Sequence, residues 1–169
     1  DIAALLFQKP VIYSKPKAPS FDLENIVKPI DLNGLSIPAA YLVKPPGSAA
    51  ITDQRVKKLQ DNKSWQETLR PLAKLNQEYI ANLDRLNISE HIANLKKIQN
   101  ALSQLGLCPE IVNLFNNNAS HNVVLKTTGS GGNDAHLLFA KNSHIAEKAL
   151  LKLKKQGFLV QSSPLLRSE

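Results

Sequence analysis

The sequence contains no methionine and only one cysteine, Cys108, among its 169 residues. A single thiol excludes an intrachain disulfide and a zinc site built on cysteine pairs, and it fits a reducing compartment such as the cytoplasm. The four histidines, His91, His121, His136 and His144, have no metal-ligand spacing. Because cytosolic proteins normally begin with methionine, and because the first residues have the pattern of the middle of an apolar helix, we expect the sequence to begin inside a longer protein.

Aromatic residues are also scarce, at 5%, and they are not interleaved with basic residues. This argues against a stacking surface for single-stranded nucleic acid. No run is long and apolar enough to span a bilayer, and the first seven residues lack the basic start of a signal peptide. The net charge of +7 is compatible with anionic substrates, and the lysines over 148–155 are typical of a solvated helix face. We therefore expect neither a nucleic-acid nor a membrane partner.

The apolar pattern predicts an α+β fold. Short apolar runs bounded by proline, glycine or asparagine predict strands over 10–14, 26–32, 37–43, 122–127, 135–140 and 158–160. Apolar residues at 3-4 spacing predict two long antiparallel helices over about 64–86 and 88–105, and shorter ones over 109–115 and 143–156. The order strand, helices, strand, strand, helix, strand predicts an antiparallel sheet with helices packed on one face.

Local signals predict how these elements begin and end. Ser64 and Glu67 match a capping box at the start of the first long helix. Gly106 is placed to end the second long helix, and Asn142 or Ser143 to cap the last one. The asparagine-rich stretch over 116–120 predicts a loop.

The strongest chemical signal is the stretch Lys126–Asp134, which reads Lys-Thr-Thr-Gly-Ser-Gly-Gly-Asn-Asp. Three glycines in four positions let the backbone approach a ligand closely, and successive N–H groups in such a turn can bind a phosphate oxygen. Hydroxyl donors and a lysine charge stand beside them. The stretch is not a Walker loop, because it lies between two strands and no Gly-Lys-Ser/Thr follows. A hairpin loop that is glycine-rich only for its geometry remains an equal alternative.

The stretch resembles the third motif of the GHMP kinases, a family that includes galactokinase, homoserine kinase, mevalonate kinase and phosphomevalonate kinase. Its ending, Gly132-Asn133-Asp134-Ala135, is most similar to bacterial phosphomevalonate kinases, with Asn133 in place of glycine and Ala135 in place of cysteine. The resemblance implies a ferredoxin-like C-terminal lobe. It assigns residues 1–32 to the tail of the N-terminal lobe and a linker, and 33–169 to the C-terminal domain.

The start of the sequence resembles the family's segment after its second motif, where an aspartate opens a helix that leads into a strand. That likeness implies Asp1 as the catalytic base. The third motif implies substrate or phosphate binding by Lys126, Thr127, Thr128, Gly129, Ser130, Gly131, Gly132, Asn133 and Asp134.

The family's cofactors are ATP and Mg²⁺, which the resemblance assigns mainly to an N-terminal kinase lobe whose phosphate loop does not occur in this chain. The partners implied are that lobe and a small phosphorylated or hydroxyl substrate, and the isolated chain is expected to be inactive. Phosphomevalonate kinase is the first function expected, with mevalonate kinase or another GHMP kinase as the alternative. A basic α+β binding module without catalysis is the rival from another class.

Overall fold

The computed structural model describes residues 11–13, 27–29, 39–45, 61, 64–128 and 135–161. The chain divides into two compact units, 1–36 and 37–169. In the first unit, β1 (Val11–Tyr13) pairs antiparallel with β2 (Val27–Pro29). Both predicted strands are thus confirmed, whereas the helix expected over 1–8 lies outside the described residues. The assignment of residues 1–32 to the tail of an N-terminal lobe and a linker stays a prediction.

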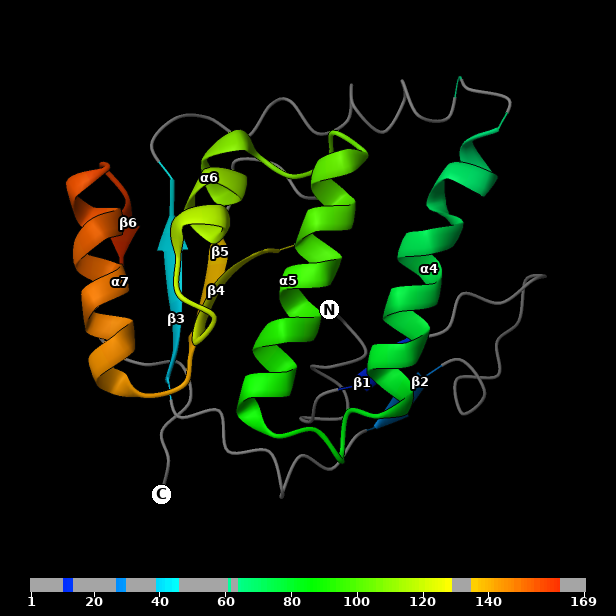
Figure 1. The fold of residues 1–169 in the computed structure, drawn as a ribbon, viewed down its shortest axis with the longest axis horizontal. Helices are drawn as coiled ribbons and strands as arrows, with labels where there is room; N and C mark the ends of the chain where they lie inside the picture. The colour runs from blue at the N-terminus through cyan, green and yellow to red at the C-terminus, as the bar shows by residue number, and fades with distance from the viewer. Residues whose placement is uncertain are drawn as a thin grey trace. The chain divides into compact units, whose positions relative to one another are not determined.

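The second unit is built on a four-stranded antiparallel sheet (Figure 1). Its strands are β3 (Ala39–Lys44), β4 (Val123–Thr127), β5 (His136–Ala140) and β6 (Leu159–Val160), in the order β4-β5-β3-β6. Leu138 of β5 lies between Tyr41 of β3 and Leu125 of β4. This strand order is that of a ferredoxin-like lobe, the fold that the resemblance implies.

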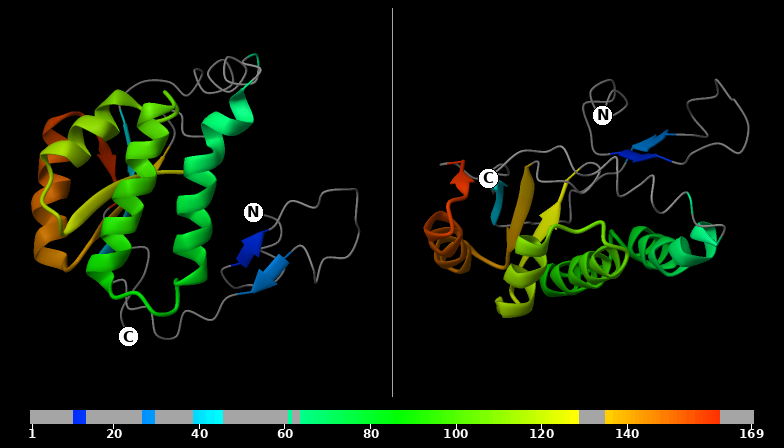
Figure 2. Two further views of the ribbon diagram at one scale, coloured as in Figure 1. Left: turned by 45° about the vertical axis from the view of Figure 1, so that its right-hand side comes forward. Right: turned by 90° about the horizontal axis from the view of Figure 1, so that it is seen from above.

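Four helices accompany the sheet: α4 (Trp65–Ala81), α5 (Ile88–Gln104), α6 (Glu110–Asn118) and α7 (Ser143–Lys155). Helices α6 and α7 lie along the strands on one side of the sheet, and α4 and α5 lie beyond β4 (Figure 2). Helices α4 and α5 run antiparallel, as predicted (Figure 1). The predicted α+β class, with helices on one face of an antiparallel sheet, is confirmed.

The main core lies between the sheet and helices α6 and α7. Alternate residues of the strands, among them Val43, Leu125 and Leu138, are fully buried there. Helix α7 buries its expected apolar face, which includes Ala146, Ala149, Leu150 and Leu153. A smaller cluster joins Ile92 and Leu95 of α5 to Val124. Val124 and Leu125 lie on opposite faces of the sheet, because side chains alternate along a strand. Helix α5 therefore contacts the second face, opposite the main core, at the β4 edge.

The helix starts differ in part from the prediction. The capping box expected at Ser64 is wrong: Ser64 precedes α4, but its ψ of 16° is not extended, and its side chain makes no cap hydrogen bond. The capping box forms instead at α5, where Asn87 has an extended ψ of 168° and exchanges hydrogen bonds with Glu90. The Asn142 cap of α7 is confirmed by its bond to the Ile145 N–H. Gly106, at φ 69°, follows α5 as expected.

The loop predicted over 116–120 is also partly wrong, because α6 continues to Asn118. Asn116 is buried, and its side-chain amide bonds both backbone groups of Leu125: Nδ2 donates to the carbonyl and Oδ1 accepts from the N–H, each at 2.8 Å. This pairing holds the last turn of α6 against β4. The asparagine run indicates a loop only when its amides face solvent.

Asn116 is one of several groups that form hydrogen bonds with the backbone of β4 along the edge that does not pair with β5. The Thr127 N–H donates to Oε1 of Gln99 on α5 at 3.2 Å, and the Val123 N–H donates to the Ser120 carbonyl at 3.3 Å. Lys96 joins the two helices by donating to the Ala119 and Ser120 carbonyls just past the end of α6. An edge strand normally exposes such unpaired backbone groups. Here α5 and α6 cover them.

We expect Asn116→Ala to lower the free energy of unfolding by about 2–4 kcal/mol, because it leaves two buried backbone groups of Leu125 without partners. Urea denaturation followed by circular dichroism measures the change. Asn117→Ala, on the exposed side of the same helix, is the matched control and should change stability by less than about 1 kcal/mol. Equal effects of the two substitutions would contradict the role given to Asn116.

Candidate functional site

The glycine-rich stretch occupies the connection of the β4–β5 hairpin. The two strands pair from Val123 opposite Ala140 to Thr127 opposite His136, which confirms the strands expected on either side of the stretch. Residues 129–134, which hold all three glycines, lie outside the described residues. The structure therefore shows the two strand ends, Thr127 and His136, that this connection joins.

Both ends of the connection are held by hydrogen bonds. Thr127 is only 4% exposed, and its N–H is bound by Gln99 of α5. The Thr128 hydroxyl donates to the Ala135 carbonyl on the other side of the connection. These contacts give Thr127 and Thr128 structural roles at the base of the hairpin. Their predicted part in binding a phosphate stays a prediction.

Lys126 lies on the opposite face of β4 from Thr127. Its Nζ donates to the Thr127 carbonyl at 2.9 Å, and burial lowers the pKa of its ammonium group. The side chain lies beside a cavity of about 160 Å³ between the second face of the sheet and the helices α4 and α5. The cavity is lined mostly by apolar side chains: Ile88, Ile92, Leu95, Leu137 and Phe139, together with Tyr79, His91 and Lys126.

Two of the polar residues in this lining form a pair. The Tyr79 hydroxyl lies 3.1 Å from Nδ1 of His91, and their rings meet edge to face at 86°. His91 is 2% exposed. Burial lowers the pKa of His91, although the Leu86 carbonyl and the Glu90 carboxylate act in the opposite direction, and burial raises the pKa of Tyr79. Both groups are therefore held in their neutral forms, as a hydrogen-bonded pair at the wall of the cavity.

The predicted site residues fall into two groups. Lys126, Thr127 and Thr128 are brought together at the end of β4, although the side chain of Lys126 lies on the other face from that of Thr127. Asp1 and 129–134 lie outside the described residues, and their roles stay predictions.

Sequence reasoning missed three residues that surround this strand: Tyr79, His91 and Gln99. Each lies on or beside the apolar stripe of its helix, and the sequence analysis assigned no function to any of them. Gln99 could have been identified as a polar residue on an otherwise apolar stripe, because a buried amide needs a hydrogen-bond partner.

The described part of the chain shows neither a metal site nor a membrane-spanning helix. It contains no group of three histidine, cysteine, aspartate or glutamate side chains placed to hold a metal ion. None of its helices is both long and apolar enough to cross a membrane.

No protein-family model and no curated protein matches the sequence, but solved structures share its fold. The Lin0012 protein from Listeria innocua matches with a TM-score of 0.62 at 19% identity, over 80% of this chain and 40% of that protein. The Methanococcus jannaschii mevalonate kinase matches with a TM-score of 0.58 at 17% identity, over 81% of this chain and 43% of the kinase. Another mevalonate kinase gives 0.61 and 17%, over 81% and 44%.

These likenesses concern the fold. The α+β fold is the one expected for the C-terminal domain of a GHMP kinase, and the predicted fold class is confirmed. The chain spans only 40–44% of the length of the three proteins that it matches.

The burial of His91 generates a pH prediction. A histidine whose pKa is lowered by folding binds protons more readily when unfolded, so its contribution to stability is complete above the unfolded-state pKa near 6.5 and declines as the pH falls below it. We expect the free energy of unfolding to fall from pH 7.5 to pH 5.5, and His91→Gln to make this slope shallower. Urea titrations at each pH measure the slope. A slope that His91→Gln does not alter would refute the assignment.

Proposed function

We propose that this chain is the C-terminal lobe of a small-molecule kinase of the GHMP type, which acts together with an N-terminal kinase lobe. One observation is the main support for the proposal. The stretch that resembles the family's third motif falls in the β4–β5 connection of a fold that the chain shares with mevalonate kinases. The sequence resemblance and the shared fold both support the proposal, and the identity to those kinases is 17%.

The arrangement suits phosphoryl transfer, which mainly requires positioning and charge neutralisation. Backbone N–H groups of the glycine-rich connection would hold phosphate oxygens, and the anchored ends at Thr127 and Thr128 would hold the connection in place. Asp1 would accept or orient the proton of the acceptor group. ATP supplies the phosphoryl group, and Mg²⁺ neutralises charge on its phosphates. We assign both to the N-terminal lobe, and no described residue of this chain is proposed as a metal ligand.

For the acceptor we propose phosphomevalonate, because the ending Gly132-Asn133-Asp134-Ala135 is most similar to phosphomevalonate kinases. Mevalonate is the second candidate, and the structural likeness to two mevalonate kinases favours it. Both acceptors are anions, and the net charge of +7 is compatible with either. The two differ by one phosphate group, so the depth and charge of the site would separate them.

The acceptor is tested by measuring ATP-dependent ADP release from the protein together with its N-terminal lobe, with mevalonate or phosphomevalonate present. We expect phosphomevalonate to stimulate ADP release at least about tenfold more than mevalonate does, since a site built for a phosphate loses about 1.4 kcal/mol or more without it. Stronger stimulation by mevalonate would replace the acceptor but keep the kinase. If neither acceptor stimulates ADP release, a binding module without this catalysis becomes the better interpretation.

The glycine-rich stretch is tested by Gly131→Ala and Gly131→Val. A side chain at this position would hinder the close approach of a phosphate, and a β-branched one would hinder it most. We expect kcat/KM to fall about 100-fold or more for the valine variant, with alanine between valine and wild type. The unfolding midpoint should change little, because the change lies in a connection. Full activity in the valine variant would show that the stretch is only a hairpin loop.

A further inference from the structure

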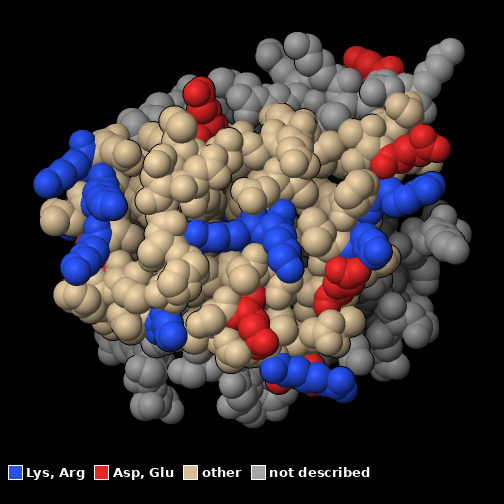
Figure 3. Space-filling model, viewed as in Figure 1, with Lys and Arg blue, Asp and Glu red and all other residues tan. Residues whose placement is uncertain are grey.

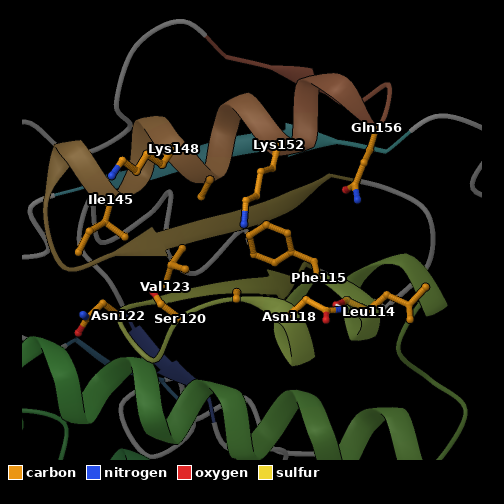
Figure 4. A pocket seen from close by; sticks show the side chains of 12 residues that line it. Leu114, Phe115, Asn118, Ser120, Asn122, Val123, Ile145, Lys148, Lys152 and Gln156 are labelled. Atoms are coloured by element: carbon orange, nitrogen blue, oxygen red, sulfur yellow. The ribbon is translucent and has the colours of Figure 1, made fainter.

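A second and larger pocket lies between α6 and α7, over the start of β4 (Figure 4). Its volume is about 580 Å³, within the range of small-molecule sites. It is lined by side chains of α6 and α7, of the segment between α6 and β4, and of Val123 at the start of β4. Lys126, Thr127 and Thr128 are not part of the lining. Val123 and Thr127 are the two ends of β4, about 13 Å apart along an extended strand, so this pocket is separate from the proposed phosphate site.

The walls of this pocket combine apolar surface with positive charge. Phe115, Val123 and Ala149 supply apolar surface, and the lining contains no aspartate or glutamate. Lys148 and Lys152 follow each other by one turn of α7, and Lys152 points into the pocket toward Phe115 (Figure 4).

Neither lysine has an ion-pair partner among the described residues, where the only salt bridge joins Lys74 to Glu78. Basic side chains gather over α7 on the visible face of the molecule (Figure 3). Within the described part of the chain, the pocket therefore presents two lysines without an ion-pair partner beside an apolar interior.

We propose that this pocket binds a small organic anion with an apolar body, whose carboxylate or phosphate group pairs with Lys148 and Lys152. The apolar body covers Phe115 and Ala149, which removes apolar surface from water. The charged group replaces solvent around the two ammonium groups and gains from their combined field. The ligand lies against α6 and α7 at once, so it joins the two helices that cover the main face of the sheet.

The size and charge of the pocket favour this occupant over two others. An amphipathic helix from another protein needs a long groove for successive anchors, whereas this pocket holds a volume typical of one small ligand. A second copy of the chain would bring its own excess of positive charge, at +7, toward the two lysines. An anion of small size meets neither obstacle.

The test measures binding of octanoate and of octyl phosphate to the full chain by calorimetry, with octylamine as the probe of opposite charge. We expect saturable binding of both anions and none of octylamine. The relative affinity of the two anions identifies the head group that the site prefers. In heteronuclear NMR spectra, the signals of Phe115, Ile145 and Lys152 should shift on addition of the anions, while those of Thr127 should not.

Matched charge substitutions on α7 separate a site from general attraction to a basic surface. Lys152→Gln should weaken octanoate binding about fivefold. Lys154→Gln removes the same charge from the same helix outside the pocket and should leave the affinity unchanged. Equal weakening by the two variants, equal binding of octylamine, or the absence of saturable binding would each overturn the proposal. So would sedimentation showing that the pocket is closed by a dimer that octanoate does not dissociate.

Discussion

The hydrogen bonds from two side-chain amides to the outer edge of β4 are the constraint on which the rest of the second unit depends. Asn116 binds both backbone groups of Leu125, and Gln99 binds the N–H of Thr127. Without them, a buried strand would carry unpaired polar groups, each of which costs free energy in the absence of water. The same contacts fix α5 and α6 against the strand. The position of the helices and the integrity of the sheet edge therefore have one cause.

This edge also determines what surrounds the candidate site. Because side chains alternate along a strand, β4 directs Thr127 into one face and Lys126 toward the cavity at the other, while its backbone meets α5. The glycine-rich connection thus starts from a strand that is held on three sides. Functional groups placed on such rigid supports keep their geometry better than groups on free loops. A phosphate-binding connection needs conformational freedom at its tip and a rigid base. The hydrogen bond from Thr128 to Ala135 adds rigidity at the base.

Much of the fold could be predicted from local sequence patterns. The stripe of α5 and the glycine after it, the Asn142 cap, and the two strands beside the glycine-rich stretch are local properties, and the structure confirms them. The errors had two causes: a role that depends on a partner elsewhere in the chain, and a local backbone conformation that the residue type does not reveal. Asn116 continues a helix because Leu125 is there to bind it, and Ser64 fails as a cap because of its own backbone angles. The Tyr79–His91 pair joins two helices, so no pattern within either helix could indicate it.

The pairing of β3 has a consequence for how the protein is made. Tyr41 lies beside Leu138, and Val43 beside Val160, so both neighbours of this strand come from a part of the chain about a hundred residues later. Such distant pairings slow folding, because the chain must close a long loop before the contacts stabilise it. On the ribosome, β3 emerges well before either partner exists, and its apolar residues lack their strand partners until β5 and β6 have been synthesised. The helices α4, α5 and α6 emerge during that interval, so they are available to cover apolar surface while the sheet is still incomplete.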